Sequence, residues 1–209
     1  MPPQLDPKRA IAFFDGQNLF YAAKDAFGYP FPNYDTKKLA KKICAERGWS
    51  LIGIRFYTGI PDESVDSVRH GFWAAKLAAM GTRGIETFSR RLRYRNQFVQ
   101  LGDGSVTTVQ VGQEKGVDVR IALDVVRLAL KNSYDVALIF SQDQDLSEAV
   151  DDVKMISRLE KRWIKLACAY PASPTYDNKR GINGTDWIQI NKKTYDSCID
   201  PVDYRRKAK

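Results

Sequence analysis

Four aspartates stand at positions where strands or helices would present them to a ligand. Asp15 directly follows an apolar run, and Asp118 lies at the start of a helical pattern. Asp143 and Asp145 follow a second apolar run. Carboxylates gathered in one place raise one another's pKa, and a divalent cation relieves that repulsion. Because oxygen-only ligation suits Mg²⁺ or Mn²⁺, the sequence predicts a metal site built from these four aspartates.

Each of these aspartates also has a purely structural interpretation. An aspartate after a strand, such as Asp143 or Asp145, often caps the next helix, and Asp15 before a glycine suits a turn. Asp118 in the first turn of a helix complements the helix dipole. The occurrence of all four at the ends of buried elements favours a shared site over unrelated local roles.

Neighbouring polar side chains suit chemistry on phosphate esters. A divalent ion lowers the pKa of bound water and neutralises the charge that develops in an in-line displacement. The amide of Asn18 could orient a phosphate or a water, and Lys115 could hold a phosphate oxygen as a point charge. Ser141 is a further candidate for substrate binding. These residues predict a hydrolytic site for phosphodiesters.

Two more acids are additional candidates. Glu114 is close to Lys115 in the sequence, but nothing there fixes the direction of its side chain. Asp124 lies six residues beyond Asp118, roughly 120° around a helix from it. Arg120 and Arg127 offer Asp124 surface ion pairs, so we favour a structural role for it.

Several other classes of site are excluded by composition. The chain has one histidine, His70, which leaves almost nothing for histidine-based nucleophilic catalysis or multi-histidine metal ligation. Its three cysteines form no Cys-x-x-Cys pair, which argues against a zinc site or a disulfide framework. No glycine-rich phosphate loop occurs, which argues against a nucleotide-binding module.

The elements that must position the aspartates alternate between strands and helices. Apolar runs predict strands over 10–14, 51–57, 84–89, 135–140 and 163–169, with a short one over 187–190. Helical spacing and capping residues predict helices over 17–26, 36–48, 61–80, 116–130 and 144–160. Such alternation predicts an α/β fold with a mostly parallel central sheet. Ligands bind such sheets beyond the carboxyl ends of the strands, where the four aspartates are placed.

The sequence predicts one domain with an insertion. The domain spans residues 8–190, and residues 191–209 form a C-terminal extension with a basic tail. The stretch from about 90 to 111 is rich in β-forming residues around Asp103-Gly104, a strong turn signal, and predicts an inserted β-hairpin.

Three motifs give the chain a family resemblance. It resembles the NYN domains of the LabA/DUF88 group, a branch of the PIN-like nucleases. The shared motifs are Phe14-Asp15-Gly16-Gln17-Asn18, Lys115-Gly116-Val117-Asp118-Val119 and Ser141-Gln142-Asp143-Gln144-Asp145-Leu146. The family pattern usually has glycine where Gln142 stands and phenylalanine where Leu146 stands.

The resemblance implies both a fold and an activity. It implies a three-layer α/β/α sandwich of PIN-like, Rossmann-like type and metal-dependent endonucleolytic cleavage of RNA. The catalytic acids would be Asp15, Asp118, Asp143 and Asp145, with Asn18 beside them. A non-catalytic RNA-binding or assembly protein that keeps the NYN fold is the alternative.

The predicted hairpin is a candidate RNA surface. Arginines at positions 90, 91, 93 and 95 alternate with Leu92 and Tyr94, a mixture of cations and rings that suits single-stranded RNA. A formal net charge of +8 also favours polyanionic partners. A solvated ribbon or an oligomer contact is the alternative interpretation, and a homo-oligomer is left open. The sequence has no run of about 18 apolar residues, so we expect a cytoplasmic protein without a membrane span.

Overall fold

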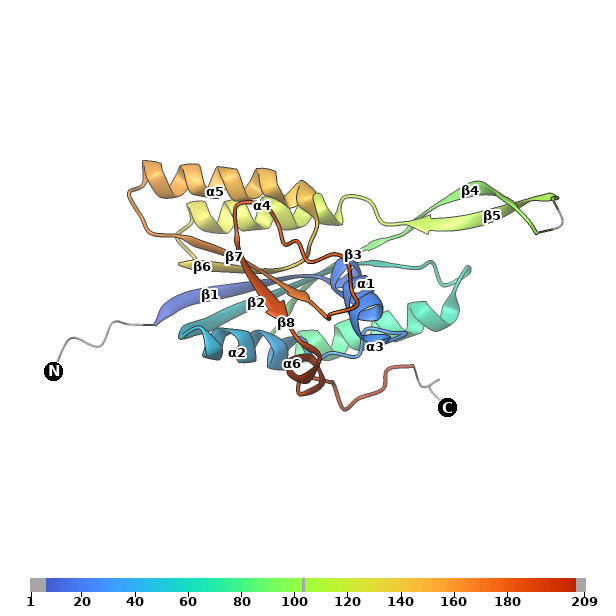
Figure 1. The fold of residues 1–209 in the computed structure, drawn as a ribbon, viewed down its shortest axis with the longest axis horizontal. Coiled ribbons are helices and arrows are strands. Elements are labelled where there is room, and N and C mark those ends of the chain that lie inside the picture. The colour runs from blue at the N-terminus through green and yellow to red at the C-terminus, as the bar shows by residue number, and fades with distance from the viewer. Residues whose placement is uncertain (1–6, 103, 206–209) are drawn as a thin grey trace.

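A parallel sheet forms the centre of the molecule. The computed structural model describes residues 7–102 and 104–205. Six parallel strands lie in the order β3-β2-β1-β6-β7-β8. They are β1 (Lys8–Asp15), β2 (Trp49–Ile60), β3 (Glu86–Arg91), β6 (Val136–Phe140), β7 (Lys165–Pro171) and β8 (Asp186–Ile190). Helices cover both faces, which confirms the expected three-layer α/β/α sandwich (Figure 1).

The helices divide into two layers with separate cores. One face carries α1 (Gly16–Phe27), α2 (Thr36–Glu46), α3 (Ser67–Thr82) and the short α6 (Lys192–Asp196). The other carries α4 (Val117–Leu130) and α5 (Ser147–Leu159), the latter preceded by the 3-10 turn η1 (Gln144–Leu146). Alternate side chains of the buried strands point into the two cores, which explains why these strands are apolar without interruption.

Strand β1 lies at the centre of the sheet. It pairs with β2 on one side and β6 on the other, and Phe14 stacks on Phe140 with ring centroids 3.9 Å apart. The chain builds β2 and β3 on one side of β1 and then β6, β7 and β8 on the other. The winding direction therefore reverses between β1 and β6, the position at which parallel sheets bind ligands.

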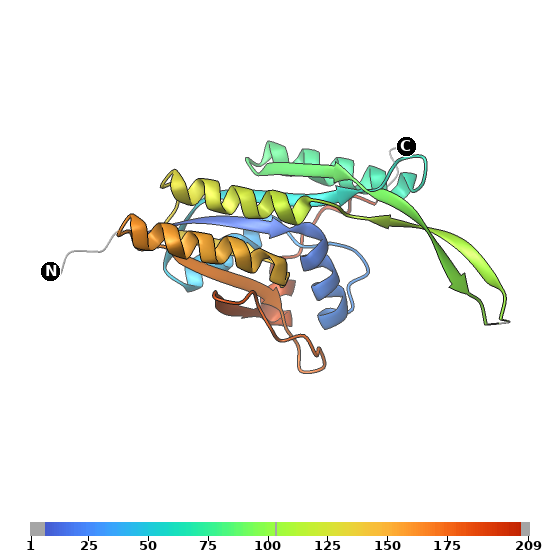
Figure 2. The same ribbon diagram turned by 90° about the horizontal axis from the view of Figure 1, so that it is seen from above.

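The predicted hairpin is present and projects from the domain. Strands β4 (Arg93–Gln100) and β5 (Val106–Gln113) form a separate antiparallel pair, and Figure 2 shows this ribbon extending well beyond the sandwich. The left-handed backbone of Gly104 (φ 83°) fits the predicted turn, whereas Asp103 lies outside the described residues.

Three predicted boundaries were wrong. Helix α3 begins at Ser67 and not at Pro61, because Asp62 accepts hydrogen bonds from Ser64 in a turn and Asp66 caps the helix. Arg90 and Arg91 belong to β3 and not to the ribbon. Helix α5 proper starts after the 3-10 turn, so the predicted start at Gln144 was three residues early.

The C-terminal extension packs on the domain over its described part. Tyr195 of α6 is fully buried, contacts the ring of Phe27 and donates a hydrogen bond to Asn33. The predicted basic tail falls mostly on 206–209, outside the described residues. No helix among the described residues is both long and apolar enough to cross a bilayer.

Candidate active site

The end of β1 and the end of β6 meet at the reversal point. Asp15, 5% exposed, caps α1 by accepting a hydrogen bond from the Asn18 backbone at 3.0 Å. Ser141 follows β6, and its hydroxyl donates to Asp15 at 3.2 Å and accepts from the Asp143 backbone at 3.1 Å. The Asn18 side-chain oxygen accepts from the Gln142 backbone at 2.8 Å. These bonds fix the two acidic loops against each other.

Asp118 reaches the same edge from α4. The helix starts after Gly116, whose left-handed backbone (φ 71°) lies against Arg90; a Cβ there would lie 2.6 Å from the guanidinium. Asp118 is in the first turn, where a carboxylate is favoured by the helix dipole. Its charge is close enough to contribute to the raised pKa of Asp15.

The surroundings of Asp15 raise the pKa of its carboxyl group. The pKa of Asp15 is raised to about 6, chiefly by burial; the hydrogen bonds from Asn18 and Ser141 oppose the rise, and the charges of Asp143 and Asp118 contribute to it. A carboxyl group in this state is costly to ionise without a compensating cation. The structure thus brings Asp15, Asp118 and Asp143, three of the four predicted aspartates, close enough for their charges to interact.

Glu114 joins this group, although the sequence left its direction open. Its carboxylate accepts a hydrogen bond from the backbone of Gly59 at the end of β2. The pKa of Glu114 is raised to about 7, chiefly by burial and also by the charges of Asp15 and Asp118. No local signal could have placed Glu114, because its partner Gly59 lies 55 residues away.

Asp145 and Lys115 lie at the exposed rim of the acidic edge. Asp145 is exposed, and its backbone N–H donates to the Asp143 carboxylate at 3.0 Å, so Asp143 also acts as the cap of η1. Lys115 is exposed beside Glu114. Ser141 is buried, and its hydrogen bonds to Asp15 and Asp143 hold the two loops together.

Asp124 is engaged in a buried network of ion pairs and hydrogen bonds. It is 2% exposed and pairs with Arg55, Arg120 and Arg127 while accepting a hydrogen bond from Tyr57 at 2.9 Å. Burial alone would raise its pKa, but the bonds from Arg120 and Tyr57 outweigh burial and hold the pKa below its usual value. The expected ion pairs exist, but their carboxylate is buried and not on the surface.

The carboxylates of the acidic edge are candidate ligands for a divalent ion. Among residues 7–102 and 104–205, no three carboxylate, thiol or imidazole side chains lie close enough to hold one ion between them. The residues still suit Mg²⁺ or Mn²⁺, because Mg²⁺ usually takes one or two carboxylates and keeps several waters. A cation among Asp15, Asp118 and Asp143 would also relieve the repulsion seen in the pKa of Asp15.

In the ribbon, the arginines and the aromatic rings that alternate along the sequence lie on opposite faces. Strand pairing puts Arg93 and Arg95 on one face, opposite Gln113 and Val111. Tyr94 and Phe98 are on the other face, because successive side chains alternate across a strand. The Tyr94 hydroxyl accepts a hydrogen bond from the Asp62 backbone at 3.0 Å. A single surface of mixed cations and rings is therefore not formed by the ribbon itself.

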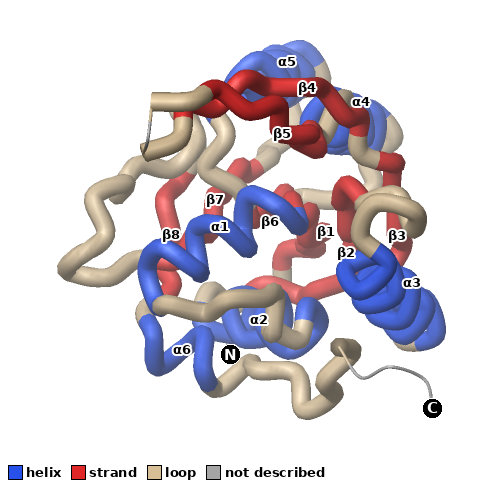
Figure 3. Tube along the Cα trace, turned by 90° about the vertical axis from the view of Figure 1, so that its right-hand side faces the viewer, coloured by secondary structure: helices blue, strands red, loops and turns tan. Residues whose placement is uncertain are grey.

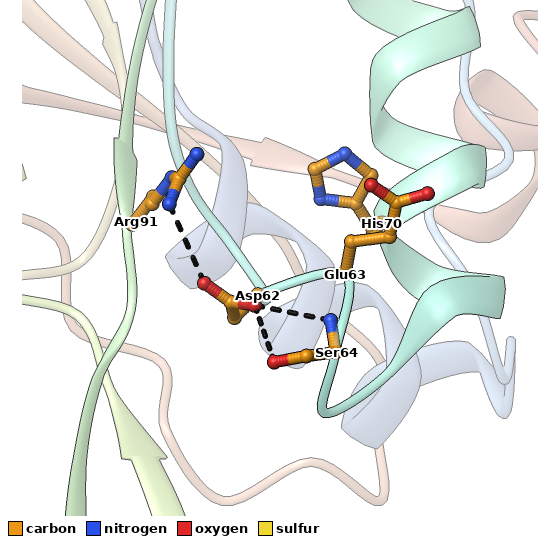
Figure 4. A pocket seen from close by; sticks show the side chains of 5 residues that line it. All are labelled: Asp62, Glu63, Ser64, His70 and Arg91. Carbon is orange, nitrogen blue, oxygen red and sulfur yellow. Dashed lines mark hydrogen bonds and ion pairs between the residues drawn. The ribbon is translucent and has the colours of Figure 1, made fainter.

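A small pocket of about 460 Å³ lies where α3 approaches β3 (Figure 4). It is lined by Asp62, Glu63, Ser64, His70 and Arg91. Asp62 binds Ser64 and pairs with Arg91 at 3.5 Å, while the imidazole of His70 lies 2.9 Å from the Pro61 carbonyl. These contacts satisfy the polar groups of the turn, so the pocket is a structural feature of the β2–α3 connection.

A loop after β7 is fastened to the acidic edge by two glutamines. The Gln142 side chain donates to the carbonyls of Asn178 and Arg180, at 3.1 and 2.8 Å. The Gln144 side chain donates to the Gly181 carbonyl at 2.9 Å and accepts from the Asn183 backbone at 3.2 Å. Gln142, which departs from the family pattern, thus fixes the neighbouring loop.

Replacing Gln144 with alanine is expected to loosen this loop. The change removes two hydrogen bonds worth about 1 kcal/mol each, so local opening should increase at least about tenfold. Trypsin cutting after Lys179 or Arg180, followed by mass spectrometry, measures the opening. Gln97→Ala in the exposed ribbon is the matched control, and equal cleavage rates in the two variants would contradict the fastening role.

The fold and the acidic edge together define an α/β sandwich of PIN-like type. Comparison with family models then identifies the family: the NYN domain model matches residues 9–161, so this chain belongs to the NYN domain family. NYN domains are PIN-like and typically nuclease-like, and PIN-like nucleases generally use divalent metals. A search of curated proteins found no match.

Solved structures support the fold. A protein of unknown function, VPA0982 from Vibrio parahaemolyticus, is similar with a TM-score of 0.52 and 17% identity, over 89% of this chain and 94% of that one. MurG from Acinetobacter baumannii is a more distant likeness, with a TM-score of 0.34 and 10% identity, over 88% of this chain and 45% of that one. At these identities the likeness to VPA0982 concerns the fold alone, and that to MurG carries no argument.

Proposed function

We propose that this protein is a metal-dependent endoribonuclease that hydrolyses RNA phosphodiester bonds. The observation that carries the proposal is the buried carboxylate of Asp15 at the reversal point of the sheet, which hydrogen bonds of Ser141 and Asn18 join to the loop of Asp143. Asp118, in the first turn of α4, adds its negative charge at the same edge. Membership of the NYN family supports it, and the three motifs favour the LabA/DUF88 group within that family.

The residues divide the work in this proposal. Asp15, Asp118 and Asp143 would hold Mg²⁺ or Mn²⁺, one or two of them directly and the others through bound waters, and the exposed Asp145 would contribute from the rim of the site. A bound divalent ion supplies a water of lowered pKa and neutralises charge on the phosphate. The amide nitrogen of Asn18 orients the phosphate, since its oxygen is already engaged by Gln142.

Cations along the edge hold the RNA backbone. Lys115 is exposed beside the acids, and Arg90 contacts the start of α4 through Gly116. Arg91, Arg93 and Arg95 continue this positive charge toward the ribbon. Point charges of this kind bind phosphates without regard to sequence.

The alternative is a non-catalytic RNA-binding or assembly protein with the same fold. The buried carboxylate of Asp15, with the charges of Asp118 and Asp143 near it, argues against it, because a scaffold gains nothing from a buried acid that its neighbours repel. Oligomer formation remains compatible with either function.

A cleavage assay on purified protein tests the proposal. Mixed single-stranded and structured RNA is incubated with Mn²⁺, Mg²⁺ or EDTA, and products are resolved by electrophoresis. We expect internal cuts with at least one metal and none in EDTA. Absence of cuts with both metals would favour the non-catalytic alternative.

A further inference from the structure

A second concave surface adjoins the acidic edge. A groove of about 570 Å³ lies between α1 and α3, which we call the α1–α3 groove, and the root of the ribbon contributes to its wall. Figure 3 shows the two helices on either side of the carboxyl ends of β1 and β2. Its volume is in the range of pockets that hold small organic ligands. None of the catalytic roles proposed above uses this groove.

One side of α1 supplies the first wall. Gln17, Phe20, Tyr21 and Lys24 recur at helical spacing and all line the groove. Tyr21 is 53% exposed, and its ring centroid lies 5.1 Å from that of Phe20. An exposed ring at this position offers a flat face to a ligand.

The opposite wall is formed by α3 and the turn before it, which carry exposed apolar side chains. Val65, in the turn before α3, and Val68, in the first turn of the helix, are apolar, yet their side chains are 49% and 60% exposed. Both line the groove together with Phe72 and Trp73. The apolar face of this segment is therefore directed partly at the groove and not wholly at the core.

The charge of the groove is positive. Lys24, Arg69 and Arg205 line it, against one carboxylate, that of Asp66. Asp66 is occupied, because it caps α3 and pairs with Arg69 at 3.4 Å. The guanidinium of Arg205 lies 3.7 Å from the ring centroid of Phe31. Arg205 is also paired, with Asp203 at 2.8 Å, so Lys24 carries the excess positive charge of a lining rich in rings.

The groove is continuous with the acidic edge. Gln17 lies two residues after Asp15, and the buried Gly59 donates its backbone N–H to Glu114 while lining the groove. The neutral face of the ribbon joins it through Tyr94, Gln110 and Gly112. A strand bound at the acids would therefore meet the groove within a short distance.

We propose that the α1–α3 groove binds unstacked bases of single-stranded RNA next to the bond held at the acidic edge. Rings stack on base faces, cations meet phosphates, and the amides of Gln17 and Gln110 can bond base edges. Paired bases in a duplex cannot present their faces to Tyr21. The inference rests on the proposed function for its substrate class and assigns the enzyme a preference for single strands.

Binding measured without cleavage tests this inference. Fluorescence anisotropy in EDTA follows a short end-labelled single-stranded RNA, a duplex of the same sequence and an abasic version of the strand. Tyr21→Ala should weaken binding of the intact single strand about tenfold, and Tyr21→Phe should restore it. Trp163→Ala is the control, since Trp163 is 49% exposed and precedes β7, at the other end of the strands.

The binding measurements separate the role of the groove from that of the acidic edge. The wild-type protein should bind the abasic strand as weakly as the Tyr21→Ala variant binds the intact strand. The inference is wrong if Tyr21→Ala binds like the wild type, as it would if the groove held a protein segment, or if Trp163→Ala weakens binding equally. Tyr21-dependent binding without cleavage in either Mn²⁺ or Mg²⁺ would overturn the nuclease alone. Normal cleavage with unchanged binding by Tyr21→Ala would overturn the groove alone.

Discussion

Replacing Asp15 with asparagine is expected to lower RNA cleavage by at least about a hundredfold. Loss of partners around metal ligands typically costs about ten- to a hundredfold, and Asp15 is proposed to contact the ion directly. Asparagine keeps the helix cap, because its side-chain oxygen can still accept the bond from the Asn18 backbone. The fold should therefore survive while the negative charge is lost.

The measurement is the initial rate of cleavage with Mn²⁺ in excess. Asp151→Asn is the matched control, since Asp151 lies on α5 with its side chain 77% exposed and pairs only with Lys154 among the described residues. It should cleave at the wild-type rate. A variant at Asp15 that retains wild-type activity would remove that carboxylate from the mechanism.

The same Asp15→Asn substitution is expected to stabilise the metal-free protein at neutral pH. The pKa of Asp15 is about 6 in the folded state against an ordinary 3.8, so the folded state binds the proton more tightly. The contribution of Asp15 to stability is therefore greatest below pH 4 and is lost as pH rises through 6. The shift of about two pKa units corresponds to roughly 3 kcal/mol lost above pH 6. Asparagine, which does not ionise, avoids this loss.

Urea unfolding in EDTA at pH 4 and pH 7.5 measures the effect. The variant should exceed the wild type by roughly 3 kcal/mol at pH 7.5 and match it at pH 4. Mn²⁺ should then stabilise the wild type more than the variant, since binding to the folded state raises its stability. A difference between the proteins that does not change with pH would show that the charge of Asp15 is not destabilising.

Much of the fold could be predicted from local patterns. The uninterrupted apolar residues of β1 and β6 mark strands buried on both faces, and alternation with helices makes the sheet parallel. Asp15 and Ser141 then fall at the same edge, because neighbouring parallel strands end together. The start of α3 was misplaced, because Pro61-Asp62 suits a helix start as well as the turn that the structure forms there before the cap at Asp66.

The sequence by itself determined which elements exist and that Asp15, Asp118 and Asp143 stand at their ends, because periodicity and capping act between residues close along the chain. Only the tertiary structure decided that Glu114 joins them through Gly59, that Asp124 is committed to Arg55 and Tyr57, and that the ribbon puts its arginines and rings on opposite faces. These outcomes depend on strand order and on packing between segments far apart in the chain. Local residue patterns carry no information about such distant partners.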